Sequence, residues 1–155
     1  MSQSNTSHSC QERMAERYTP RCLQKSAAPI EADAFHDTFL PDPSAVARMR
    51  DSTAAFLRRF GLTGPVASSV VLVVSELVTN AITHGHGEVG LAIRVADGTI
   101  SVSVTDENTA PAVLKEAGPN DLSGRGMALV EAYSDRWGSN GEETWCEFRN
   151  AGIAA

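Results

Sequence analysis

The chain has 155 residues and a mass of 16.5 kDa, which suits one ordinary domain or one small domain with a tail. Its formal net charge is −6, from 13 basic and 19 acidic residues, which argues against a general nucleic-acid binder because such proteins normally carry a basic excess. The spacing of the three cysteines fits neither a disulfide framework nor a zinc site, so we expect a reduced cytoplasmic protein.

The N-terminal part differs in composition from the rest. Residues 1–33 are rich in Ser, Gln, Asn, Glu and Arg and show no sustained hydrophobic period, which predicts a flexible N-terminal extension before one folded domain over residues 34–150. No apolar stretch typical of a secretory signal follows Met1. The longest uninterrupted apolar run, Val70 to Val74, is far shorter than the roughly 18 residues of a membrane helix, so no membrane segment is expected.

The folded part is predicted to begin with one strand and two helices. A short strand is expected over residues 34–40. Asp42-Pro43-Ser44 is a helix-start signal, and apolar residues at helical spacing predict an amphipathic helix that ends before Gly61. A second helix over residues 65–84 is apolar around much of its circumference, so it should be largely buried.

The second half of the chain is dominated by predicted strands. Two alternating apolar runs surround Asp97-Gly98, which is a strong hairpin signal. A loop follows, and a short helix is expected from about Gly126. The four predicted strands cover residues 89–95, 100–104, 135–138 and 144–148. This order predicts an α+β fold: a two-layer sandwich with helices on one face of a mixed, mostly antiparallel sheet.

Three polar features stand out from this pattern. Glu76 and Asn80 are spaced i,i+4 on the apolar helix, so they share one face, as either a structural hydrogen-bonded pair or the lining of a polar site. Asp106 stands where a strand ends, and taken alone it is more typical of an Asx turn than of a ligand site. Gly124-Arg125-Gly126 enters a helix, where glycines and free N–H groups suit a phosphate, although this motif alone is weak.

Taken together, these segments resemble the N, G1 and G2 boxes of the Bergerat-fold (GHKL) ATP-binding superfamily of histidine kinase-like ATPases. The matching segments are Glu76-Leu-Val-Thr-Asn80, Val104-Thr-Asp106 and Gly124-Arg-Gly126-Met-Ala-Leu-Val130. The ending Asp135-Arg-Trp137-Gly138 is similar to the small stand-alone branch of anti-sigma-factor serine/threonine kinases. The resemblance covers about residues 35–149 and implies the Bergerat ATP-binding fold.

The resemblance implies a role for each box residue. Glu76 would be the catalytic general base that acts on the attacking hydroxyl. Asn80 would bind nucleotide through an oxygen ligand to Mg²⁺, a hard cation that prefers oxygen. Asp106 would accept a hydrogen bond from the adenine amino group of ATP. The lid that closes over the phosphates would contain Gly124, Arg125 and Gly126.

Several positions depart from the family pattern or carry a second interpretation. Asn108 stands where the G1 box often has glycine, which would make the backbone near the adenine less adaptable. Glu142 and Glu143 replace a Lys-Thr or Thr-Thr pair, so that only Thr144 remains and negative charge is added nearby. His84 could reach a phosphate, but a helix-capping or partly buried histidine is favoured. The segment from His36 to Pro41 superficially matches a histidine-kinase phosphoacceptor box, yet it is strand-like, so a phosphoacceptor role is not expected.

The implied function is an ATP-binding, cytoplasmic regulator of transcription. The chain would be an anti-sigma-factor-type serine/threonine kinase that phosphorylates a STAS-type anti-anti-sigma protein and controls a sigma factor. Relatives in this branch often pair, so a homodimer is possible, whereas no direct contact with nucleic acid or membrane is expected. The alternative is a non-catalytic module in which nucleotide occupancy gates protein binding.

Overall fold

The computed structural model describes residues 33–112 and 125–149. The predicted N-terminal extension, apart from residue 33, and the predicted lid residue Gly124 lie outside these residues, and the domain limits of 34–150 stay a prediction. Eight elements follow in chain order: β1 (Ala34–Phe39), α2 (Ser44–Arg59), α3 (Pro65–His84), β2 (Val89–Ala96), β3 (Thr99–Thr105), α4 (Gly126–Tyr133), β4 (Arg136–Ser139) and β5 (Glu143–Arg149).

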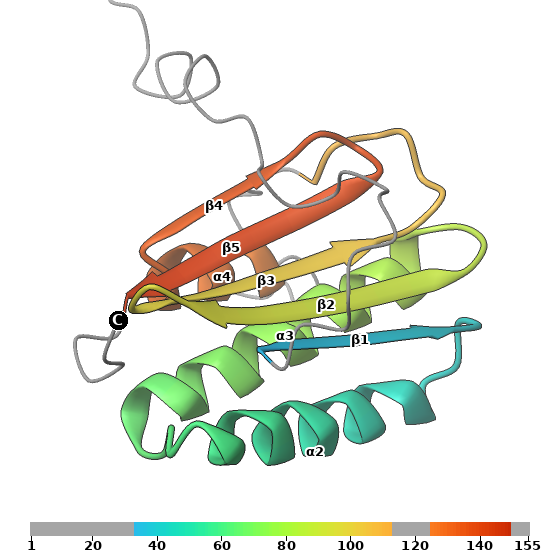
Figure 1. Ribbon diagram of the computed structural model, residues 1–155. Helices are drawn as coiled ribbons and strands as arrows, with labels where there is room; N and C mark the ends of the chain where they lie inside the picture. Colours follow the sequence, from blue (N-terminus) through green and yellow to red (C-terminus); the bar gives the residue numbers. More distant parts are fainter. Residues whose placement is uncertain (1–32, 113–124, 150–155) are drawn as a thin grey trace, which may run out of the picture. The chain divides into compact units, whose positions relative to one another are not determined.

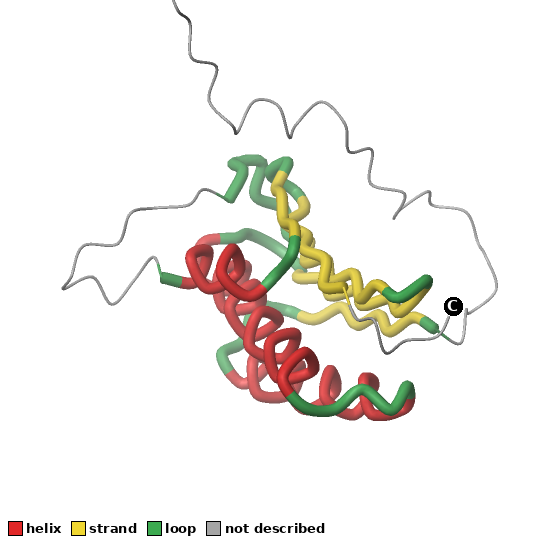
Figure 2. Tube along the Cα trace, turned by 90° about the vertical axis from the view of Figure 1, so that its left-hand side faces the viewer, coloured by secondary structure: helices red, strands yellow, loops and turns green. Residues whose placement is uncertain are grey.

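The five strands form one sheet with the order β1-β2-β3-β5-β4 (Figure 1). All four pairings are antiparallel, so the parallel component of the expected mixed sheet does not occur among the described strands. Figure 2 shows the helices together on one side of the sheet. The predicted α+β fold, with helices on one face of the sheet, is therefore confirmed.

The β2–β3 hairpin forms where the sequence predicts it. Asp97 and Gly98 both adopt positive φ, at 49° and 71°, as the two central residues of a type I′ turn require. The register then pairs Ile93 with Val102 and Leu91 with Val104. All four of these side chains are buried, so the turn places the apolar residues of both strands on the helix-covered face.

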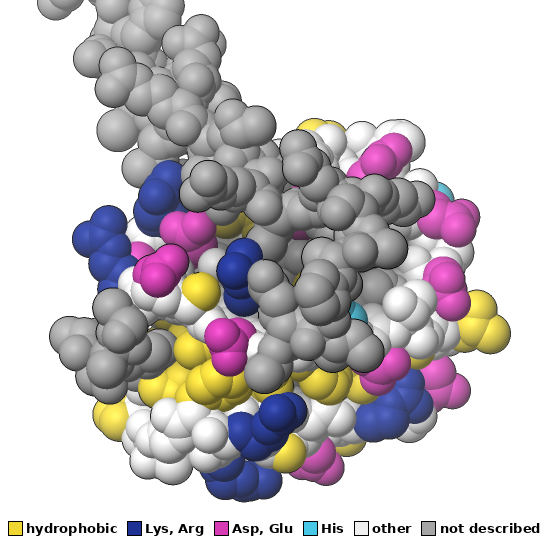
Figure 3. All heavy atoms as spheres, viewed as in Figure 1, with side chains coloured by type: hydrophobic (Ala, Val, Ile, Leu, Met, Phe, Trp, Pro, Cys, Tyr) yellow, Lys and Arg dark blue, Asp and Glu magenta, His cyan; other side chains and the backbone are white. Residues whose placement is uncertain are grey.

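Helix α2 ends at a glycine for a conformational reason. Gly61 has φ 68°, and the N–H of Leu62 donates to the carbonyl of Leu57 over 3.1 Å, which is the Schellman arrangement. Arginines cover the outer surface of this helix, and the Arg48 guanidinium lies 5.5 Å from the centre of the Phe39 ring. Figure 3 shows basic side chains over α2 at the lower edge of the view.

Helix α3 is the central helix of the core. It packs against α2, α4 and the strands β2, β3 and β5, and its buried residues are Val70, Val73, Val74, Leu77, Val78 and Ala81. By length and composition α3 is long and apolar enough to cross a membrane. The prediction from the sequence did not find this, because it considered only uninterrupted apolar runs. The packing of α3 between other elements gives a sufficient reason for its apolarity, because a core helix passes the same test.

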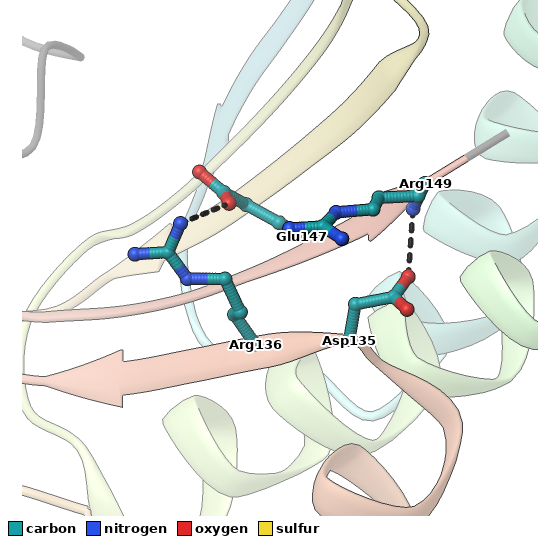
Figure 4. Close-up of polar contacts among 4 residues, drawn as sticks. All are labelled: Asp135, Arg136, Glu147 and Arg149. Atoms are coloured by element: carbon teal, nitrogen blue, oxygen red, sulfur yellow. Dashed lines mark hydrogen bonds and ion pairs between the residues drawn. The ribbon is translucent and has the colours of Figure 1, made fainter. Parts of the chain in front are cut away.

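Polar contacts fix the edge strand β4 to β5 (Figure 4). The Arg136 guanidinium lies 3.6 Å from the Glu147 carboxylate, and Asp135 accepts a hydrogen bond of 2.7 Å from the backbone N–H of Arg149. A Cβ at Gly138 would lie 2.7 Å from the Trp145 ring, so glycine leaves room for the indole on the neighbouring strand. These contacts position β5, whose first residues border the candidate site.

Candidate functional site

A cavity of about 250 Å³ opens where the end of α3, the end of β3 and the start of α4 meet. Apolar side chains form part of its wall, including Leu77, Ala81, Val104 and Met127. Polar side chains form the rest: Asn80, His84, Asp106, Asn108 and Thr144. An apolar cavity with a few convergent polar groups is the usual character of a small-molecule site.

The helical spacing of Glu76 and Asn80 brings both side chains to the start of α4. A Cβ at Gly126 would lie 3.0 Å from Glu76 Oε2 and 3.3 Å from Asn80 Nδ2. Both side chains are half-buried, and neither makes a hydrogen bond within the described part of the chain. The alternative of a structural hydrogen-bonded pair therefore has no hydrogen bond to support it, and both polar groups remain available to a ligand.

The described part of the G2 segment lies at the N-terminus of α4. Arg125 is exposed and is the N-cap residue, and no side chain caps the first turn. Uncapped N–H groups and the positive end of the helix dipole favour an anion at this position. Gly126 is half-buried, lines the cavity, and allows the close approach of α4 to Asn80.

The Asp106 side chain both stabilises a turn and lines the cavity. Its Oδ1 accepts a hydrogen bond of 2.6 Å from the backbone N–H of Asn108, so the predicted Asx turn is present. Its Oδ2 points toward the end of α3, where a Cβ at Gly85 would lie only 2.8 Å away. The carboxylate also lines the cavity, so an acceptor oxygen is held at the rim of the sheet.

Asn108, which stands where the family pattern often has glycine, makes two side-chain hydrogen bonds in the structure. Its side-chain Nδ2 donates to the carbonyl of His84 over 3.0 Å, and its Oδ1 accepts from the N–H of Ala110 over 3.0 Å. These bonds join the loop after β3 to the end of α3. Glycine could not make them, and the sequence carried only a weak signal, an Asx residue just beyond a strand end.

The residues at the start of β5 correct one expectation. Thr144 lines the cavity, and its hydroxyl donates to Ser139 Oγ over 3.1 Å. Neither Glu142 nor Glu143 lines the cavity. Glu143 faces the opposite side of the sheet from Thr144, because successive strand residues alternate in direction. Glu142 is exposed. The expected addition of negative charge beside the nucleotide is therefore not seen in the lining.

Glu143 is buried on the sheet face opposite the helices. Burial raises the pKa of its carboxyl group, and a hydrogen bond from Ser103 acts in the opposite direction. Its Oε1 is buried without a hydrogen-bond partner. The protonated carboxyl is thus favoured in the folded chain relative to an exposed glutamate.

The two histidines singled out in the sequence differ in place. His84 is the last residue of α3, is exposed and lines the cavity. His36 is exposed in β1, opposite Ala92 of β2. The expected strand-like character of the His36 segment is therefore confirmed.

The donor set of the cavity fits a nucleotide. Asp106 offers an acceptor beside apolar walls at one end, as a purine with an amino group requires, and the N-terminus of α4 suits phosphate at the other. Among the described residues no group of three or more His, Cys, Asp and Glu could hold a metal ion. The oxygen of Asn80, together with phosphate oxygens and water, would suit Mg²⁺ here. Fold and cavity together define the class: an α+β sandwich with a nucleotide-type site.

Comparison with known proteins identifies the family. Residues 39–149 match the histidine kinase-like ATPase domain, and the chain belongs to this family of ATP-binding domains. It is 30% identical to the anti-sigma F factor of Geobacillus stearothermophilus over 99 residues, which cover 56% of this chain and 68% of that protein. With the anti-sigma F factor of Bacillus subtilis strain 168, the identity is 28% over the same coverage.

A solved structure shares the fold. The crystal structure of the RsbU and RsbW domains of Rv1364c from Mycobacterium tuberculosis superposes with a TM-score of 0.58 at 22% identity. The match covers 76% of this chain and 32% of the other, so this chain spans about a third of that protein's length. At this identity the likeness shows the fold alone.

Proposed function

We propose that this protein is an ATP-dependent anti-sigma-factor-type serine/threonine kinase, acting in the cytoplasm on a STAS-type anti-anti-sigma protein and controlling a sigma factor. The single observation that carries the proposal is the convergence of Glu76 and Asn80 on Gly126, at the uncapped start of α4. A carboxylate, an amide oxygen and a helix N-terminus at one point suit the transfer of a phosphoryl group. The names of the anti-sigma F relatives support this assignment.

The cavity residues would orient ATP. Asp106 Oδ2 would accept a hydrogen bond from the adenine amino group, and Leu77, Val104 and Met127 would contact the base. The phosphates would lie at the start of α4, with Gly126 providing room and Arg125 adding positive charge. Gly124, outside the described residues, would belong to the lid over the phosphates.

Glu76 is proposed as the general base. Its carboxylate would take the proton of the substrate hydroxyl while that oxygen bonds to the γ-phosphorus and the bond to the β,γ-bridging oxygen breaks, which releases ADP. Asn80 would hold Mg²⁺ through its side-chain oxygen, and the ion would neutralise phosphate charge when bound. One helical turn separates Glu76 from Asn80, so both can face the same phosphate.

Phosphate transfer from γ-labelled ATP to purified STAS-type proteins tests this proposal. Wild type should label one of them, and Glu76→Gln should lower the rate by about 10²–10⁴-fold, the usual contribution of a general base. Glu131→Gln is the matched control, because Glu131 is exposed on α4 and does not line the cavity. Equal rates for wild type and Glu76→Gln would remove Glu76 as the base.

The second candidate is a nucleotide-gated binding module without phosphate transfer. The hydrogen bonds of Asn108 favour it, because they fasten the loop beside the cavity that glycine would leave more adaptable. Under this alternative, calorimetry would detect binding of MgATP, the melting temperature would rise, and no labelled protein would form.

Sedimentation of the same samples tests whether the chain forms the homodimer expected from the family.

A further inference from the structure

A second hollow, of about 580 Å³, lies between α2 and α3 on the helical layer. Its α2 wall is formed by Arg50, Ala54 and Arg58, which follow one another at i,i+4 spacing and so form one ridge. Ser68, Leu72 and Glu76 form the corresponding row on α3. We call this hollow the α2–α3 groove.

Glu76 belongs to this groove as well as to the neighbourhood of the cavity. Its carboxylate faces Gly126 at the start of α4, one turn before Asn80, which lines the cavity. The proposed base therefore stands between the place of the nucleotide phosphates and the groove. A hydroxyl that reaches Glu76 from the groove side would leave the cavity free for ATP.

The charge of the groove indicates what it would bind. Arg50 and Arg58 are exposed, and neither guanidinium group forms an ion pair or hydrogen bond within the described residues. By contrast, Arg48 and Arg59 lie over the rings of Phe39 and Phe56. The backbone positions of Arg50 and Arg58 are about 12 Å apart along one helix ridge. In a chain of net charge −6, their guanidinium groups offer a local site for carboxylates.

The shape of the groove suits a chain segment rather than a small ion. Between the two arginines, and on the facing helix apart from Glu76, the groove residues are small or apolar, including Ala54, Ala67, Ser68 and Val71. The two helices are antiparallel and joined by a short connection (Figure 1). The groove residues extend along α2 from Arg50 to Arg58 and along α3 from Ala67 to Glu76. Arg50 lies toward the Glu76 end and Arg58 toward the connection, so one segment could contact both arginines and the base.

We propose that the α2–α3 groove is the docking site for an acidic segment that flanks the phosphoacceptor serine or threonine of the protein substrate. This inference rests on the proposed kinase function and names how that substrate is recognised. Acidic side chains of the segment pair with Arg50 and Arg58, and these pairs place the acceptor hydroxyl at Glu76. Arg50 and Arg58 are positioning residues, because they contact the segment and not the reacting atoms.

Peptide binding tests the groove separately from phosphate transfer. The probe is a fluorescein-labelled peptide with a central serine flanked by Asp and Glu, compared with the same peptide carrying Asn and Gln. Anisotropy with the full chain and a non-hydrolysable ATP analogue should show binding of the acidic peptide that weakens with salt. The double variant R50E/R58E should weaken this binding by about tenfold or more, whereas R50K/R58K should retain most of it.

Two controls make the result decisive. Arg149→Gln removes an exposed arginine of β5 outside the groove and should leave peptide binding unchanged. Calorimetry with ATP should give equal affinity for wild type and R50E/R58E, which shows that the variant is folded and that its cavity is intact. Backbone NMR shifts caused by the peptide should fall on the α2 and α3 residues of the groove.

The groove proposal and the kinase proposal fail in different ways. Equal binding of the acidic and neutral peptides, equal binding by R50E/R58E, no binding at all, or NMR shifts away from α2 and α3 would overturn the groove proposal. Absence of ATP binding or of phosphate transfer by wild type would overturn the kinase proposal instead. With a labelled STAS-type substrate, R50E/R58E should raise KM with kcat nearly unchanged, which a merely structural role would not produce.

Discussion

The carboxylate of Asp106 lies directly against Gly85: a Cβ at position 85 would lie 2.7 Å from Asp106 Cγ and 2.8 Å from Asp106 Oδ2. This contact joins the residue after α3 to the residue after β3, two places separated by a complete hairpin. The φ of Gly85 is −77°, so glycine is required here by close approach and not by backbone conformation. The position of the Asp106 carboxylate therefore depends on the absence of a side chain at 85.

Gly85→Ala should disturb both folding and the cavity. The added methyl group would meet the Ala81 carbonyl and the Asp106 carboxylate, and overpacking of this kind costs about 1–3 kcal/mol. Urea unfolding should show the loss, and calorimetry should show weaker ATP binding. Gly61→Ala is the control, because Gly61 has open space around it but φ 68°. It should lose stability through backbone strain while keeping its ATP affinity, and an unchanged ATP affinity in Gly85→Ala would contradict this account.

Asp106→Asn separates the turn from the ligand contact. Asparagine retains a side-chain oxygen that can accept from the Asn108 N–H, so the Asx turn and the melting temperature should change little. The charged acceptor for the adenine amino group is lost, and hydrogen bonds to charged groups contribute about 1.5–3 kcal/mol. ATP affinity measured by calorimetry should fall by roughly ten- to a hundredfold. A variant that binds ATP as tightly as wild type would show that Asp106 has only the turn role.

Asn108→Ala should loosen the loop after β3. It removes the hydrogen bonds to the His84 carbonyl and from the Ala110 N–H, each worth about 0.5–1.5 kcal/mol net. The expected loss of unfolding free energy is about 1–3 kcal/mol in urea titrations. Thr109→Ala is the neighbouring control, since the Thr109 residue is exposed. Equal midpoints for the two variants would mean that the Asn108 bonds do not hold the loop in solution.

Local patterns were sufficient for most of the fold. The hairpin followed from Asp97-Gly98, because this pair favours the type I′ turn, whose backbone twist matches that of the flanking strands. The end of α2 followed from Gly61, which supplies the left-handed residue of the helix terminus. The common face of Glu76 and Asn80 followed from helical spacing, which fixes the relation of two side chains without any tertiary information.

Contacts between distant segments could not be predicted in the same way. The bonds of Asn108 depend on where the end of α3 meets the loop after β3, and the sequence does not specify that distance. The orientation of Glu143 depends on the register of β5 with β3, because a shift of one residue would turn its side chain to the other face. The α2–α3 groove likewise arises from two rows of residues on separate helices.

Glu143→Gln should change how stability depends on pH. Burial raises the folded-state pKa of the Glu143 carboxyl above its ordinary value of 4.5, so the folded chain binds the proton more tightly than the unfolded chain. As pH rises from about 4.5 through this raised pKa, the folded state must hold a buried carboxylate, and the free energy of unfolding falls. Glutamine stays neutral and avoids this pH-dependent loss.

The expected result for Glu143→Gln is a relative gain in stability that grows as pH rises above about 4.5 and levels off beyond the folded-state pKa. Urea unfolding of wild type and variant between pH 4 and pH 8 measures it, and the readout is the change in their difference with pH. Glu142→Gln is the matched control, because Glu142 is exposed one residue earlier. If the two variants differ from wild type by the same amount at every pH, then Glu143 is solvated in the folded chain and its unpartnered Oε1 is in contact with water.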